Sequence, residues 1–350
     1  MELIFPKIKV PVLQNRVFET QQSAVDSDYG FIELAKNKES GIFENVLFDS
    51  KKLIYDSNYD NEQSNSIVFQ NHLKEVSSIL FPYMGNRKIV EVGCGKGYFL
   101  ELLVAQGIDA YGCDPTYTGK SERVVREFFS EKLGLTGDLI ILRHVLEHIQ
   151  NPVDFLYRIA AANGNKGLIY IEVPDFNWII KNQAFFDVFY EHVNYFRPKD
   201  FQNIFSNIHD KGLLFGGQYQ YVIADLSSIQ LPPYKIEQSS NDDIIKFESL
   251  NKLVKKLKST SSPIYIWGAA SKGVILAMHL IKAGIPIQNL IDINPNKQSK
   301  FTALTGIQII SPEQFCTIGT GSSLIIVNPN YEAEIKGVTS LLEQVSYIVL

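Results

Sequence analysis

The sequence predicts an α/β protein in which two doubly wound sheets follow a small N-terminal cap. From Lys88 onward, short apolar strand patterns alternate with helical patterns, which implies parallel strands with helices on both faces. Two of the apolar runs end in a glycine-containing turn that opens a helix. The chain has 350 residues, too many for one typical core, so we expect two or three domains.

We divide the chain into three predicted parts: a cap lobe at 1–66, a Rossmann-like domain at 67–236 and a second, smaller Rossmann-like domain at 237–350. The cap shows no clear hydrophobic period, and we expect a small or irregular lobe there. Apolar residues at helical spacing predict a helix over 67–80 at the start of the first α/β domain. The polar run EQSSNDD (237–243) separates the two α/β domains.

Each α/β domain contains short apolar segments that we expect to form strands. In the first domain these segments lie at 88–92, 108–114, 123–129, 138–142 and 166–174. In the second domain, a helix with one apolar stripe at 244–258 comes first, and the strands follow at the start of 263–284, at 289–295 and at 323–330. The alternation of strand and helix makes a parallel sheet the expected core of both domains.

Composition excludes several functional classes. Hydrophobic residues make up 45% and charged residues 20%, which is typical of a soluble globular protein, and a net charge of −5 argues against a generic nucleic-acid binder. The cysteines Cys94, Cys113 and Cys316 form no CxxC pair, so we expect no cysteine-rich zinc site and a reducing compartment. No apolar run is long enough to span a bilayer, so we expect a cytoplasmic protein without a membrane partner.

The turn VEVGCGKGY (90–98) is the most informative motif. A buried strand delivers Glu91, and three glycines let the backbone turn tightly and approach a ligand: Gly93, Gly95 and Gly97. A dinucleotide fingerprint needs glycine at position 98, which is Tyr98 here. Asp114 ends the next strand, where an acid can accept hydrogen bonds from ribose hydroxyls. The G-x-G-x-G spacing after an acidic strand residue instead resembles the first motif of class I S-adenosylmethionine-dependent methyltransferases.

The segment HVLEHI (144–149) follows the strand at 138–142, whose carboxyl end faces the ligand crevice of a doubly wound sheet. We expect His144 near the cofactor, whereas Glu147 and His148 are expected to be structural because a helix would turn them partly away. The candidate cofactor residues also include Cys94, Phe128 and Arg143.

Together these motifs resemble the three-part sugar C-methyltransferases, which methylate nucleotide-linked 4-keto-deoxysugars. VEVGCGKG (90–97) is similar to their cofactor motif, YEHVNYF (190–196) to their active-site Glu-His segment, and GAASKG (268–273) to their C-terminal domain. The resemblance extends from about Pro11 to the end. It implies S-adenosyl-L-methionine as cofactor, S-adenosyl-L-homocysteine as product and a nucleotide sugar bound between the central domain and its neighbours.

The chain departs from that family at two places. Family members usually carry four zinc-binding cysteines in the cap, and the corresponding stretch AKNKESGIFEN (35–45) has none, so no metal site is expected. Family members often have a tyrosine two places before the glutamate. Here that position is Phe189, and Tyr190 stands immediately before Glu191.

The stretch FFDVFYEHVNYF (185–196) supplies the candidate catalytic residues Tyr190, Glu191 and His192. A carbon nucleophile forms when a base removes a proton beside a carbonyl, and histidine is the usual base near neutral pH. We expect His192 to be this base. Glu191 orients the imidazole, accepts the proton itself or holds a sugar hydroxyl, and Tyr190 donates to the enolate oxygen. Aromatic neighbours would exclude water from the site.

Four residues are candidates for the substrate. Tyr59 and Gln63 lie in a cap segment that approaches the active site in the family that this chain resembles. Gln218 lies in the paired-glycine stretch FGGQYQY (215–221), and Lys272 in the C-terminal turn is placed to meet a phosphate. A surface loop, a strand bend and an unliganded scaffold turn remain the alternatives for these three segments.

Four functions remain open on sequence alone. The first is an S-adenosylmethionine-dependent C-methyltransferase that acts on a nucleotide-linked keto-sugar through an enolate. The second is an O- or N-methyltransferase on a sugar or natural-product intermediate, with the same cofactor. The third, an NAD(P)-dependent sugar oxidoreductase, is disfavoured because Tyr98 stands where a dinucleotide-binding turn needs glycine. The Tyr-x-x-x-Lys pair of short-chain reductases is also unworkable here, because Pro198 between Tyr195 and Lys199 prevents the two from sharing one helical turn. A non-catalytic binding protein is disfavoured by the crowding of ionisable groups near the expected crevice. Oligomeric state is left undetermined.

Overall fold

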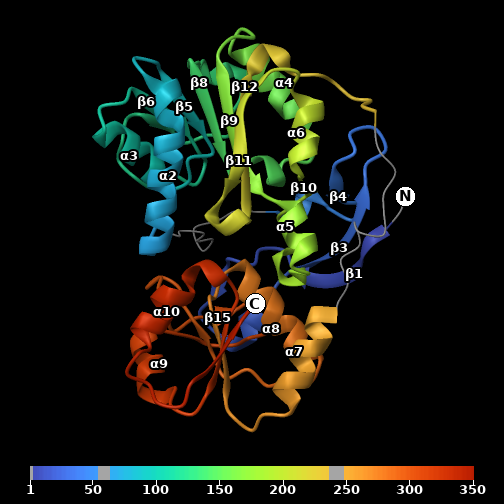
Figure 1. Cartoon of the computed structure of the whole chain (residues 1–350), viewed down its shortest axis with the longest axis vertical. Coiled ribbons are helices and arrows are strands. Elements are labelled where there is room, and N and C mark those ends of the chain that lie inside the picture. The colour runs from blue at the N-terminus through green and yellow to red at the C-terminus, as the bar shows by residue number, and fades with distance from the viewer. Residues whose placement is uncertain (1–2, 54–63, 236–247) are drawn as a thin grey trace.

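The computed structural model describes residues 3–53, 64–235 and 248–350. The candidate substrate residues Tyr59 and Gln63 lie outside these ranges. Figure 1 shows the central domain above, the C-terminal domain below and the N-terminal cap strands along one side.

The central domain is built on a seven-stranded sheet with the strand order β11-β12-β9-β8-β5-β6-β7. All neighbours pair in parallel except β12, which is antiparallel to both β9 and β11. The inner strands are mostly apolar, apart from Glu91, Arg143 and Glu172, because helices cover both faces of a parallel sheet. The strands are β5 (Ile89–Val92), β6 (Ala110–Cys113), β7 (Val124–Val125), β8 (Leu139–Arg143), β9 (Leu168–Pro174), β11 (Ile208–Leu214) and β12 (Tyr219–Asp225).

Helices pack on both faces of this sheet. One face holds α2 (Ile67–Met84) and α3 (Tyr98–Ala105), and the other holds α4 (Pro152–Ala162) and α6 (Pro198–Ile204). Ser66 caps α2 by accepting a hydrogen bond from the backbone N–H of Phe69, which satisfies one of the free donors at a helix start. The short helix α5 (Phe176–Lys181) follows β9 and extends toward the C-terminal domain (Figure 1).

The C-terminal domain has a five-stranded, fully parallel sheet with the order β16-β14-β13-β17-β18. Its strands are β13 (Ile264–Trp267), β14 (Leu290–Ile291), β16 (Ile309–Ile310), β17 (Ser323–Ile326) and β18 (Ser346–Val349). Its helices are α7 (Glu248–Lys258), α8 (Ser271–Lys282), α9 (Pro312–Ile318) and α10 (Glu332–Val338). A capping box at Ser311 and Gln314, with Pro312 in the first turn, fixes the start of α9.

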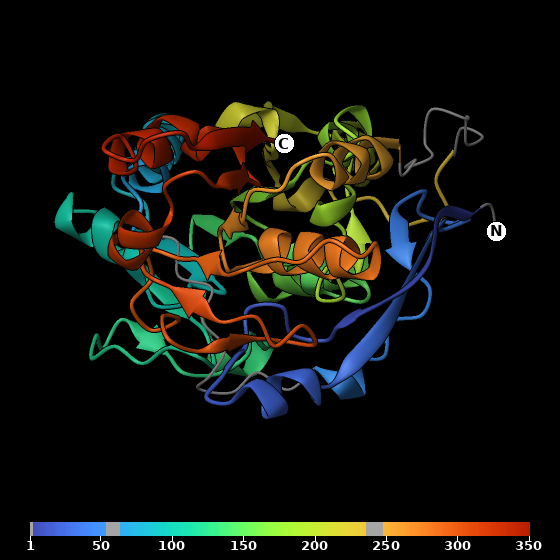
Figure 2. The same cartoon turned by 90° about the horizontal axis from the view of Figure 1, so that it is seen from below.

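The cap forms an antiparallel sheet, although its sequence shows no clear period. Its strand order is β1-β3-β4-β10, and the fourth strand comes from the candidate catalytic segment. A two-stranded ladder of β2 and β15 joins the cap to the C-terminal domain. Figure 2 shows the molecule from below, with the C-terminal domain toward the viewer. These elements are β1 (Leu3–Pro11), β2 (Val17–Phe18), α1 (Gln21–Val25), β3 (Tyr29–Lys36), β4 (Phe43–Asn45), β10 (Asn194–Tyr195) and β15 (Phe301–Thr302).

One apolar core connects the three parts of the chain. Phe43 of the cap, Phe185 of the candidate catalytic segment and Leu276 of α8 belong to the same buried cluster. The segment that carries the candidate base is therefore packed between the cap and the C-terminal domain, so both neighbours fix its position.

The secondary structure agrees with most sequence predictions and refines others. The predicted helix over 67–80 is α2, and a helix does begin at Pro198, with Tyr195 in a strand before it. The predicted strand at 123–129 is wrong in extent, because only Val124–Val125 pair with β6. The limits drawn between the three parts stay predictions, and 236–247 lies outside the described residues.

Among the described residues, no helix is both long and apolar enough to cross a bilayer.

Candidate functional site

A cavity of about 220 Å³ lies where the cap, the central domain and the C-terminal domain meet. The cap contributes Asn15, whose side-chain amide donates to Ser271 Oγ at the start of α8 over 3.2 Å. The central domain contributes ionisable and aromatic side chains, namely His144, Glu147, His148, Asp187, Glu191, His192, Phe189 and Tyr219. The C-terminal domain contributes the turn after β13 and the ends of β14 and β17. One cavity therefore brings together groups from distant parts of the sequence.

The first glycine turn has the geometry that its sequence predicts. Gly93, Gly95 and Gly97 have φ of 74°, 56° and 82°, a region that favours glycine. A Cβ on Gly93 would lie 2.4 Å from the Val145 side chain, so the turn packs closely against the chain next to His144. A Cβ on Gly95 would meet nothing within 4 Å among the described residues, so this part of the turn faces open space.

Asp114 holds this turn in place. Its Oδ2 accepts a hydrogen bond from the Gly95 N–H over 2.9 Å, and its Oδ1 accepts from the Thr116 N–H and hydroxyl over 2.7 Å each. A carboxylate has about four acceptor positions, so one remains for a ligand hydroxyl. Asp114 thus stands at the turn with the acceptor that a ribose needs.

Glu91 is buried beneath the turn, with 3% of its surface exposed. Its Oε2 has no hydrogen-bond partner among the described residues. Burial raises the pKa of Glu91 to about 7, against the opposing pull of Arg143. An orphaned buried oxygen under an open glycine turn fits a ligand that supplies a donor, and S-adenosylmethionine, with an amino group and ribose hydroxyls, has such donors. The residues present therefore fit this cofactor.

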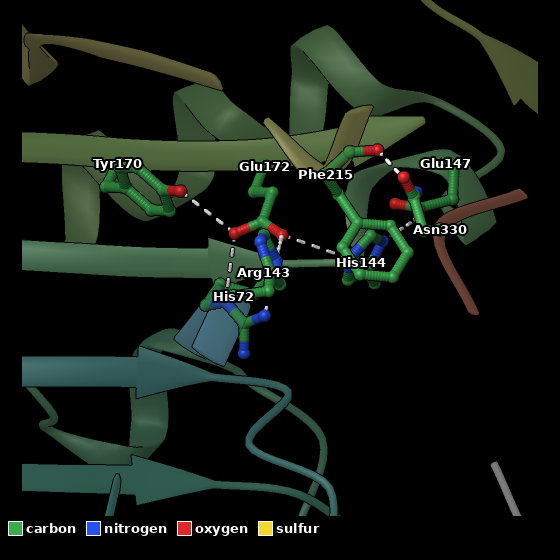
Figure 3. Close-up of polar contacts among 8 residues, drawn as sticks. All are labelled: His72, Arg143, His144, Glu147, Tyr170, Glu172, Phe215 and Asn330. Atoms are coloured by element: carbon green, nitrogen blue, oxygen red, sulfur yellow. Dashed lines mark hydrogen bonds and ion pairs between the residues drawn. The ribbon is translucent and has the colours of Figure 1, made fainter. Parts of the chain in front are cut away.

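Glu172 is the centre of a buried polar network next to the turn (Figure 3). Its Oε1 contacts His72 Nε2 at 2.7 Å and His144 Nε2 at 3.2 Å, and its Oε2 accepts from Arg143 Nε at 3.0 Å and from the Tyr170 hydroxyl at 2.9 Å. Burial opposes ionisation of the Glu172 carboxyl, yet Arg143 and the two histidines hold its pKa well below the usual range.

His144 connects this network to the cavity. Its φ of 52° is unusual for a residue other than glycine, and its Nδ1 lies 3.3 Å from Glu147 Oε1. Burial disfavours the charged ring, but the contacts with Glu147 and Glu172 outweigh this and raise the pKa of His144 to about 9. His144 is therefore a cation at neutral pH, at the expected place beside the cofactor turn.

Glu147 and His148 face the cavity, contrary to the structural role expected from sequence. They lie in a short 3-10 turn, Leu146–His148, that directs both side chains toward His192. The rings of His148 and His192 meet edge to face, with centroids 4.9 Å apart. His148 Nδ1 donates to the Glu191 carbonyl oxygen over 2.9 Å, although 43 residues separate the two positions. The contact could not be inferred from sequence spacing.

His192 and Glu191 both line the cavity, and their catalytic roles stay predictions. His192 packs against the Phe189 ring with centroids 4.0 Å apart, and burial, together with His148, His144 and Lys272, holds its pKa well below the usual range. His192 is therefore a neutral imidazole near pH 7. Glu191 Oε1 accepts from the Gln14 N–H of the cap over 3.1 Å, so the cap helps to position this carboxylate.

The prediction of a catalytic Tyr190 is wrong in its placement. The Tyr190 ring packs against Gly30 and Phe48 of the cap, and its hydroxyl bonds the Asp49 backbone, accepting from N–H over 2.8 Å. Its side chain does not line the cavity, because the chain turns between Tyr190 and Glu191 and sends the two side chains to different surroundings. Tyr190 anchors the cap instead.

Arg143 is also placed differently from its prediction. Its guanidinium is committed to Glu172 and lies 4.8 Å over the Phe99 ring, and it does not line the cavity. The Cys94 thiol is buried, and the Phe128 ring is 72% exposed after β7. Neither side chain lines the cavity, so cofactor contacts of Cys94 and Phe128 stay predictions.

The two described substrate candidates, Gln218 and Lys272, are brought together. Lys272 Nζ donates to Gln218 Oε1 over 2.8 Å and pairs with Asp187 Oδ2 at 2.8 Å. The Gln218 amide in turn donates to Asn328 Oδ1 over 2.8 Å, so this chain of polar contacts links the central and C-terminal domains. Lys272 lines the cavity, whereas Gln218 lies behind it.

The C-terminal turn repeats the geometry of the cofactor turn. Asp292 Oδ2 accepts from the Ala269 N–H over 2.9 Å and its Oδ1 from the Asn294 N–H over 2.9 Å, as Asp114 does with Gly95 and Thr116. Helix α8 then begins at the cavity wall.

Lys297, which the sequence did not single out, also lines this end of the cavity. Its side chain is 3% exposed, and its Nζ has no hydrogen bond or ion pair within the part of the chain that the structure describes. An ammonium group without a partner at the wall of a cavity suits an anionic ligand.

Comparisons with known proteins assign two domains. Residues 58–208 match the family described as "Methyltransferase domain", and residues 239–345 match the family described as "C-methyltransferase C-terminal domain". Together with the cofactor turn, these matches establish an S-adenosylmethionine-dependent methyltransferase with S-adenosylmethionine as its cofactor. The comparison with curated proteins found no match.

Solved structures match somewhat less than half of the chain. The methyltransferase domain of bacterial CtHen1-CN is 16% identical, with a TM-score of 0.37, over 45% of this chain and 99% of its own. A SAM-dependent methyltransferase from Archaeoglobus fulgidus is 19% identical, with a TM-score of 0.35, over 45% of this chain and 99% of its own. The PH0226 protein from Pyrococcus horikoshii OT3 is 13% identical, with a TM-score of 0.36, over 49% of this chain and 99% of its own. Likenesses of this degree say nothing about substrate or mechanism.

We predict that Asp114→Ala weakens S-adenosylhomocysteine binding by about 10- to 100-fold, because hydrogen bonds to a charged group contribute about 1.5–3 kcal/mol. Isothermal titration calorimetry measures the effect. Asp109→Ala, which removes an exposed carboxylate that pairs with Arg123 in the same domain, is the matched control and keeps wild-type affinity. Equal affinities of Asp114→Ala and wild type would remove Asp114 from the cofactor site.

The raised pKa of Glu91 predicts that the free energy of unfolding depends on pH. Its pKa rises from 4.5 to about 7 on folding, so the folded state binds the proton more tightly and stability falls as pH increases through this window. At about 1.4 kcal/mol per pKa unit, Glu91→Gln gains about 3 kcal/mol relative to wild type above pH 7. Urea unfolding at pH 5 and pH 8 measures this. A pH-independent difference between Glu91→Gln and wild type would contradict the prediction, and Glu101→Gln on an exposed position of α3 is the control.

Proposed function

We propose that the enzyme methylates a carbon beside the ketone of a nucleotide-linked deoxysugar, with His192 as the base that generates the enolate. The observation that supports this most is the shared cavity. Its lining includes His144 and His192 of the central domain together with Asp292 and Lys297 of the C-terminal domain. Such a cavity suits a substrate with a reactive sugar at one end and an anionic nucleotide at the other.

His192 has the properties that proton removal from carbon requires. It lines the cavity, its ring nitrogens make no hydrogen bond among the described residues, and its lowered pKa keeps it unprotonated at neutral pH. Phe189 and the buried surroundings exclude water, which strengthens electrostatic interactions with the reacting atoms. S-adenosylmethionine, when bound, supplies an electrophilic methyl group. The role of His192 is to take the proton from the carbon that becomes the nucleophile.

Glu191 assists from the cap side in this proposal. Its Oε1 is held by the Gln14 N–H, and its carbonyl oxygen accepts from His148. This arrangement fits a carboxylate that holds a sugar hydroxyl and keeps the reactive carbon near His192.

The nucleotide end of the substrate rests on the C-terminal domain in this proposal. The N-terminus of α8, with Ser271 and Lys272, faces the cavity, and helix N-termini favour anions. Lys272 is already balanced by Asp187, whereas Lys297 is unpaired among the described residues. We assign the diphosphate to this end, with Lys297 as its main cationic partner and Lys272 as a secondary one.

The acceptor is a small molecule in this proposal. The net charge of −5 opposes a phosphate-backbone partner, and the cavity of about 220 Å³ suits part of a nucleotide sugar. A hydroxyl or amine as methyl acceptor is the competing possibility, since His192 can remove those protons too.

We predict that His192→Gln lowers kcat by about 10²- to 10⁴-fold, the contribution typical of a general base, and leaves S-adenosylhomocysteine affinity unchanged. Exchange of the proton beside the ketone into deuterated water, followed by NMR without the methyl donor, reports the base step directly. Wild type exchanges and His192→Gln does not. His209→Gln, which removes an exposed histidine paired with Asp225, is the control. Methyl transfer by wild type without any such exchange would favour an oxygen or nitrogen acceptor.

We also predict that Lys297→Met weakens binding of uridine or thymidine diphosphate by about 10- to 100-fold, as expected for the loss of one charge-assisted hydrogen bond. Calorimetry with these two nucleotides measures the effect. Lys282→Met at the exposed end of α8 keeps wild-type affinity. Unchanged affinity in Lys297→Met would place the nucleotide elsewhere.

A further inference from the structure

Glu147, His148 and His192 form a cluster with the donor set of a metal site. One potential ligand atom from each residue lies within 4.8 Å of the other two. Glu147 and His148 come from the 3-10 turn after β8, and His192 lies 45 positions after Glu147 in the chain. Only the fold brings the three residues together. All three line the cavity.

The donor atoms of this cluster are available. His148 Nδ1 donates to the Glu191 carbonyl oxygen, which fixes the ring and leaves Nε2 as the atom with the lone pair. A hydrogen bond of this kind, from the distant ring nitrogen to a carbonyl, is how proteins orient metal-binding histidines. The ring nitrogens of His192 make no hydrogen bond among the described residues.

Glu147 provides the independent sign of a missing partner. Its side chain is 1% exposed, and its Oε1 lies 3.3 Å from His144 Nδ1. Its Oε2 is buried and has no hydrogen-bond partner within the described ranges. A buried carboxylate oxygen without a partner is costly, and a cation would satisfy it.

We propose that Glu147, His148 and His192 bind a divalent transition-metal ion, for which Zn²⁺ is the probe. Two imidazoles and one carboxylate suit zinc, iron, cobalt and nickel rather than magnesium or calcium, which prefer oxygen ligands. Three protein ligands would leave one or more coordination positions for a water molecule or a ligand in the cavity that all three residues line.

The second histidine cluster of the chain does not offer the same site. His72, His144 and Glu172 also lie within 4.8 Å of one another. However, both Glu172 oxygens are engaged, by His72 on one side and by Arg143 and Tyr170 on the other (Figure 3). Both oxygens of Glu172 therefore have partners among the described residues, unlike Glu147 Oε2, so we assign no metal to this group.

Metal binding and the proposed base compete for the same lone pair on His192. A bound ion therefore inhibits proton removal if His192 is the base, and metal-loaded enzyme is inactive until a chelator releases the ion. Binding itself does not depend on the proposed function, so the two claims fail separately.

The test uses full-length, untagged protein that has been stripped of metal by a chelator. Calorimetry with Zn²⁺ and the visible absorption of Co²⁺ measure stoichiometry, affinity and coordination. We expect one ion per chain, and an affinity at least about 10- to 100-fold lower in Glu147→Gln and His148→Gln, since even changes outside the ligand shell cause losses of this size.

One matched control variant and one measurement of folding make the result specific. His209→Gln removes an exposed histidine near Asp225 and keeps wild-type metal affinity. Circular dichroism melts show whether Glu147→Gln and His148→Gln remain folded, and the Co²⁺ spectrum of a folded variant then reports the loss of a ligand.

Absence of stoichiometric Zn²⁺ binding to wild type, or binding that survives both Glu147→Gln and His148→Gln, overturns the metal site and leaves the assignment of His192 as base untouched. Activity that requires added metal supports the site and instead overturns His192 as the base.

Discussion

The buried carboxylate of Glu172 is the interaction on which the arrangement of the site depends. It is fully buried and joins α2 through His72, β8 through Arg143 and the cavity wall through His144. Removing one partner of such a buried ion pair typically costs about 3–5 kcal/mol, because an uncompensated charge is left behind. The network therefore holds His144 in its unusual backbone conformation. It also sets where the following 3-10 turn places Glu147 and His148.

The two Rossmann-like domains contain turns of the same design. In each Rossmann-like domain, an aspartate at the end of the second strand accepts a hydrogen bond from a backbone N–H of the first turn, as Asp114 does for Gly95 and Asp292 for Ala269. Of the two turns, the C-terminal one lines the cavity together with Glu191 and His192, whereas the glycines of the turn at 93–97 are not among the lining residues.

The cap is positioned by packing and strand pairing, and it contains no cysteine. Strand β10 extends its sheet from the central domain, and the β2–β15 ladder ties it to the C-terminal domain. Tyr190 fills a space against Gly30 that a Cβ would close, and its hydroxyl bonds Asp49. A buried aromatic side chain of this size contributes more to stability than to chemistry. Its position explains why a phenol next to Glu191 in sequence does not reach the cavity.

The sequence alone determined the features that depend on local spacing. The glycine turn at 93–97, the acid at 114, the helix that starts at Pro198 and the alternation of strands and helices follow from backbone preferences within a few residues, and the structure shows all of them. Only the tertiary structure decided which side of a turn each side chain takes. The side chains of Tyr190 and Arg143 do not line the cavity, whereas Glu147, His148 and Lys297 do. These contacts join residues tens to hundreds of positions apart. Their geometry depends on how whole domains pack, which no local pattern records.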